Sequence, residues 1–273
     1  MNVKLGICNF CVPGTGIFAP QFVKEAGLDG MSIEFGTYEN HYPSFTRRVQ
    51  DEYLAVQKEL GIEYCNVGMS CFDFIPFTAH RGDPMHEIVK GTLRAAIDTA
   101  EYMQIPMVFI PSFGVSSIET EDQMDNAVEM FRFACAYAKD RGVLISSENK
   151  MRVPRQIELV ERVDMENFSL FYDSYNYFYQ SGYDQLEMLK GMYPYMGPQL
   201  HVKDGKPGVL AGSLLGEGDS GFYGVMEFLR EKNYEGWIIS ENLYEKQPTN
   251  TFETDVWELF LKDVATMKKE AAK

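Results

Sequence analysis

Four short segments in the second half of the chain end in side chains that can bind a metal ion. They read ISSEN, FYDSYN, LHVKDG and IISEN, and they supply Glu148, Asp173, His201 and Glu241 in that order. Burying such a group without a partner costs free energy on the order of kilocalories per mole. An apolar segment that carries one is therefore expected either to end at the solvent or to place the group in a functional site. Three carboxylates and one imidazole suit a divalent cation such as Mn²⁺, Mg²⁺ or Co²⁺, and Zn²⁺ is also compatible with them.

Each of these four residues has an ordinary explanation when it is taken singly. A Glu at the end of a strand is more often a solvated loop residue than a ligand, and a lone His on a strand is usually a structural group. The joint pattern favours a metal site, because four separate segments would otherwise each have to offer a metal-competent side chain by chance. We therefore predict one divalent cation, with Mn²⁺ preferred, at these residues.

The elements that would position these side chains alternate regularly along the chain. Thr120, ahead of Glu121 and Asp122, is the residue type of a helix N-cap, and Gly61 and Gly142 follow helical patterns as stop signals. The β-rich runs are 3–8, 31–35, 62–68, 107–111, 143–148, 168–173, 199–204 and 237–241, and the segments with helical spacing are 18–27, 46–60, 84–103, 121–141, 154–163, 183–193, 221–232 and 252–270.

This alternation predicts an α/β fold, and specifically a (β/α)8 TIM barrel. Dividing 273 residues by eight gives about 34 per unit, which is the length that an uninterrupted βα series needs. An open, doubly wound sheet is the competing layout, but the residues after the first strand do not form its Gly-rich phosphate-binding turn. We see no linker or low-complexity stretch, so we predict one domain over residues 1–273.

In such a barrel the chemistry lies at the carboxyl ends of the strands. Strands five to eight are neighbours there, so the four side chains should meet in one ring.

Composition and charge narrow the classes of function. A formal net charge of -15 argues against a nucleic-acid or anionic-membrane partner, because most of the surface would repel either one. Five cysteines, an odd number, and the absence of a leader-like start predict a cytoplasmic protein with reduced thiols. Cys8 and Cys11 form a CxxC pair, which we interpret as packing because no second pair accompanies it.

The four segments that carry Glu148, Asp173, His201 and Glu241, together with LLGEGDSGFYGVMEFLREKNYEGW, resemble the xylose isomerase-like TIM barrel superfamily and its sugar phosphate isomerase/epimerase group. The likeness runs from the second strand to the eighth and is most specific from GEGD to EGWIISE. In that family the four strand-end residues coordinate one divalent ion. The resemblance therefore implies a metal-dependent isomerase or epimerase that acts on a small-molecule ketose or keto-sugar derivative.

The chemistry that this resemblance implies begins with proton loss next to a carbonyl. A cation bound by the carbonyl oxygen and the neighbouring hydroxyl stabilises the resulting enediolate. Epimerisation then needs a base on one face of the sugar and an acid on the other. Glu148 and Glu241 come from opposing sides of the expected ring, and the corresponding carboxylates alternate in these roles in the epimerase branch.

Further residues are expected to contact the substrate. Lys203 shares strand parity with His201 and should point inward, while Asp204 should point away. Lys203 would stabilise an oxyanion or hold an anionic substrate group, or else serve as a counterion for the acidic ring. The long loop 71–84 after strand three is expected to act as a lid, with packing between loops as its alternative. The substrate-binding candidates are Lys203, Asn176, Glu34, His80, Arg81 and Lys150.

This sequence differs from the ketose 3-epimerases in two respects, and both favour considering other activities. Asn176 and Pro207 stand where those enzymes carry a His and an Arg that touch substrate hydroxyls, which speaks against a free ketohexose substrate. Lys203 in HVKD is closer to the inosose dehydratase branch, so a lyase acting on a keto-cyclitol or an oxidised glycoside is the alternative. A third class of function is a non-catalytic metabolite-binding barrel or subunit. The resemblance to the family also implies self-association into a homo-oligomer.

Overall fold

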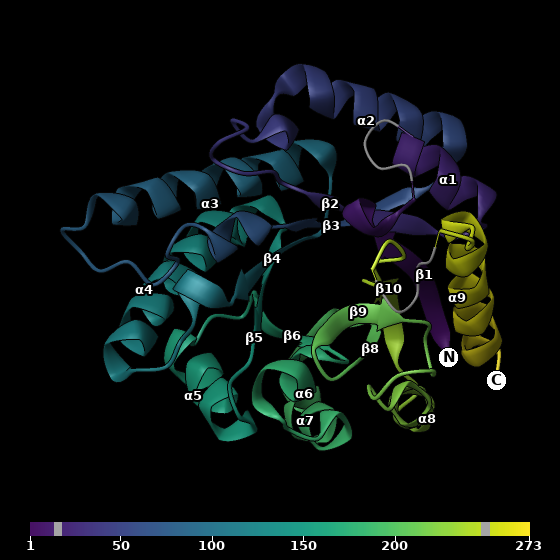
Figure 1. Ribbon diagram of the computed structural model, residues 1–273. Helices are drawn as coiled ribbons and strands as arrows, with labels where there is room; N and C mark the ends of the chain where they lie inside the picture. The colour runs from purple at the N-terminus through teal and green to yellow at the C-terminus, as the bar shows by residue number, and fades with distance from the viewer. Residues whose placement is uncertain (14–17, 247–251) are drawn as a thin grey trace.

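The computed structural model of this protein describes residues 1–13, 18–246 and 252–273. Its centre is a closed barrel of eight parallel strands with helices around it, which confirms the predicted TIM barrel (Figure 1). Around the barrel the strands follow the order β1-β10-β7-β6-β5-β4-β3-β2. The barrel strands are β1 (Asn2–Cys8), β2 (Gly30–Glu34), β3 (Glu63–Gly68), β4 (Met107–Ser112), β5 (Leu144–Asn149), β6 (Phe168–Asp173), β7 (Met196–Val202) and β10 (Glu235–Ser240).

The helices cover the outside of the barrel, and one of them was not predicted. The short helix α6 follows β6 directly and leads into α7, which corresponds to the predicted segment 183–193. The helices are α1 (Ala19–Glu25), α2 (Arg47–Leu60), α3 (Pro84–Met103), α4 (Glu121–Ala138), α5 (Val153–Val163), α6 (Asn176–Ser181), α7 (Gln185–Met192), α8 (Phe222–Glu231) and α9 (Val256–Ala271).

The helix ends explain why the predicted boundaries are close to the observed ones. Thr120 and Gln123 form a capping box at the start of α4, in which each side chain accepts a backbone N–H of the other residue. Gly61 ends α2 in the left-handed conformation, which glycine adopts without a steric penalty. Helix α4 stops earlier than predicted because its last residues tighten into a 3-10 turn, Lys139–Arg141, before Gly142.

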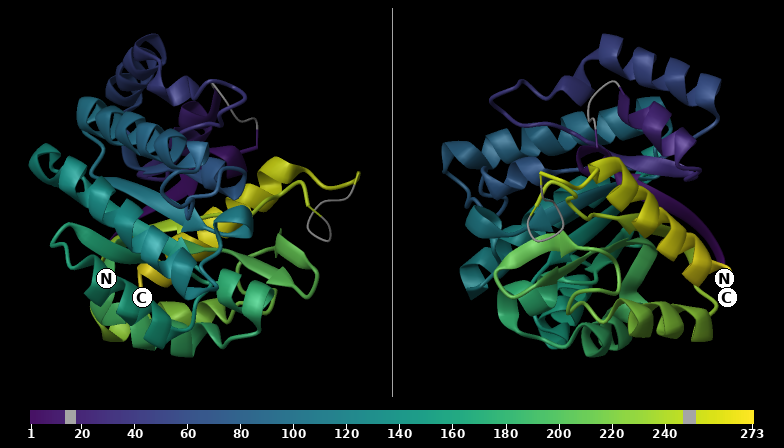
Figure 2. Two further views of the ribbon diagram at one scale, coloured as in Figure 1. Left: turned by 90° about the vertical axis from the view of Figure 1, so that its left-hand side faces the viewer. Right: turned by 45° about the vertical axis from the view of Figure 1, so that its right-hand side comes forward.

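The predicted strand 199–204 is wrong at its carboxyl end. The barrel strand β7 stops at Val202, and Asp204 begins an antiparallel hairpin, β8 (Asp204–Lys206) and β9 (Val209–Ser213), which projects from the barrel (Figure 2). The buried Asp204 carboxylate accepts backbone N–H groups from Gly205, Gly216, Gly218 and Ser220. These bonds turn the chain out of the barrel, an outcome that strand periodicity does not encode.

The same anchor explains part of the GEGD segment. A Cβ atom on Gly218 would lie 2.3 Å from Asp204 Oδ1 and 2.3 Å from the carbonyl oxygen of Gly205, so only glycine fits there. Asn242, after β10, accepts the N–H of Asp204 and donates to the carbonyl of Ser213 at 2.9 Å. The base of the hairpin is therefore fastened both to the loop that follows it and to the segment after the last barrel strand.

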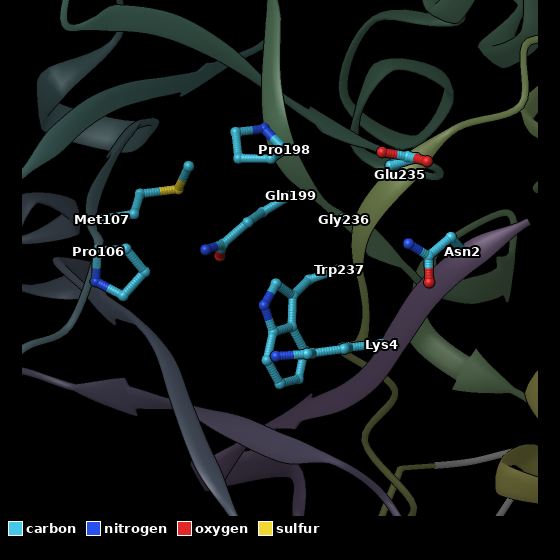
Figure 3. Close-up of a pocket in the computed structure, with 9 residues that line it drawn as sticks. All are labelled: Asn2, Lys4, Pro106, Met107, Pro198, Gln199, Glu235, Gly236 and Trp237. Atoms are coloured by element: carbon cyan, nitrogen blue, oxygen red, sulfur yellow. The ribbon is translucent and has the colours of Figure 1, made fainter.

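A pocket lies at the end of the barrel that is formed by the amino ends of its strands. Trp237 and Gln199 line it, and Lys4 lies over the Trp237 ring at 5.5 Å from the ring centroid (Figure 3). The two chain termini lie side by side at the edge of the molecule in all views (Figures 1 and 2). Among the described residues, no helix is both long enough and apolar enough to cross a bilayer.

Candidate metal centre

The structure brings the four residues of the predicted ring together. One ligand atom from each of Glu148, Asp173, His201 and Glu241 lies within 4.8 Å of the others. Glu148, Asp173 and His201 lie at or near the carboxyl ends of β5, β6 and β7, and Glu241 follows the last residue of β10. These four strands are consecutive around the barrel, and Asp173 is directly opposite His201 in the β6–β7 register. Parallel pairing therefore produces the cluster.

The two oxygens of Asp173 have different partners. Oδ1 accepts the backbone N–H groups of Tyr175 at 2.8 Å and Asn176 at 2.7 Å, which fixes the turn into α6. Oδ2 is buried and makes no hydrogen bond to any described residue, although it lies 3.2 Å from Nζ of Lys203. Oδ1 thus fixes the backbone turn, and Oδ2 faces the cluster.

His201 presents its Nδ1 atom to the two glutamates. Nδ1 lies 3.4 Å from Oε2 of Glu241 and 3.9 Å from Oε1 of Glu148, yet it makes no hydrogen bond among the described residues. The imidazole is fully buried, and the rings of Phe109 and Phe171 pack against it with centroid separations of 5.1 and 4.6 Å. The ring is held in place, while its inward nitrogen has no hydrogen-bond partner in the described part of the chain.

Lys203 points inward, as its parity with His201 predicts. It is almost completely buried, and its Nζ atom makes ion pairs with Asp173 and Glu241. Ser174 fixes the backbone at this point, because its hydroxyl donates to the carbonyl of Lys203 and accepts the N–H of the same residue. Lys203 is thus a counterion of the acidic ring, and it also lines the pocket above that ring.

The two glutamates differ in their protonation. Burial raises the pKa of Glu148 to about 8, and the nearby Glu241 carboxylate adds to the rise. Burial also acts to raise the pKa of Glu241, but Lys203 and His201 outweigh it and hold that pKa below its ordinary value. The cluster therefore places one carboxyl group that favours a proton beside one that favours its charge.

These residues fit a divalent cation. When all three carboxyl groups are ionised and the imidazole is neutral, as metal ligands must be, their three negative charges and the one positive charge of Lys203 leave a net charge of -2, which a divalent ion would balance. Two buried atoms, Asp173 Oδ2 and His201 Nδ1, lack hydrogen-bond partners among the described residues, and both face the cluster. Such atoms are costly to leave unsatisfied. The mixture of carboxylate oxygens and one imidazole nitrogen suits ions of the Mn²⁺ and Mg²⁺ type.

A pocket of about 360 Å³ opens directly above the cluster. Glu148, Glu241, Lys203 and Asn176 all line it, so the structure brings these sequence-predicted residues to one cavity. Asn176 donates from Nδ2 to Oε1 of Glu148 at 2.9 Å and so orients that carboxylate. The apolar part of the wall comes from Phe109, Pro111, Phe113, Tyr179 and Leu210.

Glu34 reaches the pocket only indirectly. It ends β2, and its carboxylate accepts the hydroxyl of Ser70 at 2.8 Å and the N–H of the same residue at 3.2 Å. Ser70 in turn lines the pocket at the start of the loop after β3. Burial raises the pKa of Glu34 to about 7, and the bonds from Ser70 oppose that rise. Its observed partner is thus the loop after β3.

Three of the predicted substrate-binding residues lie elsewhere. Arg81 makes an ion pair with Glu129 at 2.8 Å, and the exposed His80 contacts the carbonyl of Arg81. Lys150 makes an ion pair with Glu119 at 3.0 Å in a separate pocket. None of the three is among the described residues that line the cavity above the cluster.

The predicted lid segment divides in the same way. In the loop after β3, Phe72 and Phe77 are buried, whereas Phe74 is 70% exposed. The structure therefore places two of these rings in interior packing and leaves one in solvent. Whether the loop closes over a substrate stays a prediction.

Sequence reasoning missed several residues of the site. Asp73 and Ser70 line the pocket from the 3-10 turn after β3, and Tyr179 and Gln180 line it from α6. Both segments lie in connections that follow barrel strands. Hydrophobic periodicity does not predict the path of such connections. The aromatic character of the loop after strand three was the one available signal for its participation.

Comparisons with known proteins agree with this geometry. A family model described as "Xylose isomerase-like TIM barrel" matches residues 20–259. A curated relative, the 2-epi-5-epi-valiolone 7-phosphate 2-epimerase of Actinoplanes sp. strain SE50/110, is 26% identical over 230 residues, which cover 84% of this chain and 83% of that protein.

Solved structures share the fold across nearly the whole chain. D-psicose 3-epimerase with D-tagatose from Clostridium cellulolyticum H10 superposes with a TM-score of 0.78 at 15% identity, covering 99% of each chain. The 3-keto-D-glucoside 4-epimerase of E. coli superposes with a TM-score of 0.76 at 13% identity, covering 98% of this chain and 100% of the other.

Proposed function

We propose, from the premise that this chain belongs to the xylose isomerase-like TIM barrel family, that the protein is a sugar isomerase or epimerase that requires a divalent cation. The substrate is a ketose or another keto-sugar derivative, and Mn²⁺ is the preferred ion. One observation carries the proposal. Glu148 and Glu241 face one cavity from strands three positions apart in the barrel, with Asp173 and His201 between them.

Glu148, Asp173, His201 and Glu241 would hold the ion. When bound, it supplies Lewis-acid stabilisation to the oxyanion that develops as a keto-sugar loses its α proton. The relatives support this class of substrate, because the valiolone phosphate enzyme, the psicose enzyme and the keto-glucoside enzyme are all described as epimerases.

The two glutamates would move the proton. Glu241, beside Lys203, is set to be ionised and to accept a proton from the sugar carbon. Glu148 lies across the cavity and accepts a hydrogen bond from Asn176, which orients its carboxyl group toward the sugar from another direction. It would return to the sugar a proton taken from solvent, and Glu241 would release the proton it has accepted to solvent. A proton returned to the opposite face gives an epimer, and a proton returned to the neighbouring carbon gives an isomer.

The remaining pocket residues would bind and orient the sugar. Lys203 and Asn176 present a cation and an amide to substrate oxygens, while Phe109 and Phe113 supply apolar wall and help to exclude water. Elimination of a β-hydroxyl shares the first proton transfer, and Lys203 in the pocket favours it as the second candidate, because its ammonium group can assist a leaving hydroxyl.

A deuterium-exchange experiment tests this function. We would load the protein with Mn²⁺, offer a panel of ketoses, inososes and 3-keto-glucosides in D₂O, and follow loss of the substrate C–H signal by NMR. Glu148→Gln and Glu241→Gln should each slow exchange by about 10² to 10⁴-fold. Glu63→Gln, an exposed carboxylate at the other end of the barrel, is the matched control and should exchange normally.

The product distinguishes the candidate reactions. Exchange with recovery of a sugar isomer supports the proposal, and exchange with loss of water supports the lyase instead. Normal exchange in both Gln variants would remove the glutamates as proton carriers. Wild-type protein that binds these sugars without any exchange would show a metabolite-binding barrel.

A further inference from the structure

We propose that Cys8 is a positioning residue for His201: its sulfur accepts a hydrogen bond from Nε2–H and so turns the unprotonated Nδ1 toward the carboxylates. This inference rests on the cation site of the proposed function, but it does not depend on the identity of the sugar. It also gives a role to one cysteine of the CxxC pair, which we interpreted from the sequence as packing.

The contact crosses the barrel interior. Cys8 is the last residue of β1, and β10 lies between β1 and β7 in the barrel order. Its Sγ atom lies 3.4 Å from Nε2 of His201, and both side chains are completely buried. Among the described residues, Cys8 is the hydrogen-bond partner of this nitrogen, while Nδ1 has none and faces Glu148 and Glu241.

The sulfur contact selects one of two ring orientations. The rings of Phe109 and Phe171 meet the imidazole at interplanar angles of 85° and 73° and restrict its plane. They do not distinguish a ring from the same ring turned by half a rotation about its Cβ–Cγ bond, because the two shapes are nearly identical. The turned ring would place carbon against Cys8 and carbon against the glutamates. Only the observed orientation gives both nitrogens a polar neighbour.

The sulfur contact also decides which nitrogen carries the proton. A neutral imidazole has one N–H and one lone pair. If the Cys8 thiol donated to Nε2, the ring proton would lie on Nδ1 and would block it as a ligand. If Nε2–H donates to the sulfur, Nδ1 keeps its lone pair.

A thiol is an unusual choice for this position, and the charge of the cluster explains it. Metal-binding histidines more often donate to a carboxylate, a backbone carbonyl or water. Here three carboxylates, once ionised to bind a cation, and one lysine already give the cluster a net charge of -2. A neutral thiol orients the imidazole without adding a fourth buried negative charge.

Two substitutions of Cys8 separate positioning from packing. Cys8→Val fills a similar volume but cannot accept a hydrogen bond, whereas Cys8→Ser keeps an acceptor. We would measure Co²⁺ and Mn²⁺ affinity by competition with a chromophoric chelator and check folding by thermal denaturation in EDTA. Cys8→Val should weaken binding by about 10 to 100-fold, and Cys8→Ser should restore most of it. The control is Cys135→Ser, a buried cysteine whose thiol contacts the carbonyl of Asn167.

Each other outcome has a definite meaning. Wild-type affinity in Cys8→Val would overturn the positioning role. Equal weakening in Cys8→Val and Cys8→Ser would reduce the contact to packing. A sulfur-to-cobalt charge-transfer band that disappears in Cys8→Ser would make Cys8 a direct ligand, which also overturns the proposal. Protein that binds Co²⁺ in this pattern but transforms no sugar would count against the proposed function alone.

Discussion

The two ends of the barrel interior use polar side chains in opposite ways. At the amino ends of the strands, Asn66 donates to Gln199 at 2.8 Å, and Gln199 donates to the carbonyl of Cys65 at 2.7 Å. At the carboxyl ends, charged groups are crowded together, and Asp173 Oδ2 and His201 Nδ1 have no hydrogen-bond partner among the described residues. The first region is satisfied by its own neighbours, and the second would be satisfied by an added cation.

This difference separates stability from function along the same strands. Neutral amides that pair with one another cost little to bury, whereas like charges held close together raise the free energy of the folded state. The amino-end network should therefore support the fold, and the carboxyl-end cluster should weaken it in chelator-treated protein. Substitutions at the two ends should have opposite signatures.

The largest expected effect is loss of the cation at the carboxyl end. Glu148→Gln should lower Mn²⁺ affinity by about 100-fold or more, because a ligand carboxylate becomes a neutral amide. The free energy of unfolding in EDTA should change by less than about 1 kcal/mol, because burial already favours the neutral form of this group. Calorimetric titration and urea denaturation measure the two quantities. Unchanged affinity would remove Glu148 from the ligand set.

The matching experiment at the amino end is Gln199→Leu. This change leaves Nδ2 of Asn66 and the carbonyl of Cys65 without their partner, so it should cost about 1 to 3 kcal/mol of unfolding free energy. Mn²⁺ affinity should stay at the wild-type value, and Glu63→Gln serves again as the surface control. A parallel loss of affinity would show that the two ends are coupled and would break the comparison.

The dependence of Mn²⁺ affinity on pH should follow the protonation of Glu148. Its pKa of about 8 means that chelator-treated protein carries this proton at neutral pH, and Mn²⁺ must displace it. Affinity should therefore fall by up to about tenfold per pH unit as the pH drops below 8. Titrations between pH 6 and about pH 9 in buffers of different ionisation heat count the released proton. A flat profile would contradict the raised pKa.

The same raised pKa predicts a trend in stability, and its sign follows from linkage. Between the ordinary Glu pKa of 4.5 and about 8, the folded protein binds a proton that the unfolded chain has released. In EDTA the contribution of Glu148 to stability is thus fully present below pH 4.5 and is lost as the pH rises through about 8. Glu148→Gln should flatten this trend, which urea denaturation across the range would reveal.

The smallest effect is expected at Asn176. Asn176→Ala removes the hydrogen bond that orients Glu148 but leaves the four ligands in place, so Mn²⁺ affinity should fall only about fivefold. Gln21→Ala, an exposed amide on α1 that pairs with Glu25, is the control. A loss as large as that of Glu148→Gln would make Asn176 part of the ligand set itself.

The sequence was sufficient to predict the barrel and the ring of four metal-competent side chains at the carboxyl ends of its strands. The alternation of β-rich runs and helical patterns predicts the fold, because hydrophobic periodicity identifies each element locally and an unbroken βα series places consecutive strands side by side and parallel. The ring follows because carboxyl ends of neighbouring parallel strands must meet. His201 and Lys203 share strand parity, so their common inward direction could also be read from the sequence.

The parts that the sequence did not predict lie in the connections. Asp204 was expected to point away, and in the structure it organises the turn that ends the barrel strand. His80 and Arg81 carry suggestive side chains, but their loop takes them to the surface, where Arg81 pairs with Glu129. The contact of Cys8 with His201 joins residues 193 positions apart, and no local pattern encodes it.

The anchored hairpin makes this barrel a favourable scaffold for grafting. The backbone bonds to Asp204 and the side chain of Asn242 fasten its base, and Leu243 and Lys246 donate to the carbonyls of Ala211 and Leu210 on its second strand. Leu210 also reaches the cavity. A longer or differently charged tip could therefore be inserted at Pro207 and Gly208 without disturbing the residues beneath. Libraries varied at this one reverse turn would sample new shapes beside the cavity while leaving the acidic cluster unaltered.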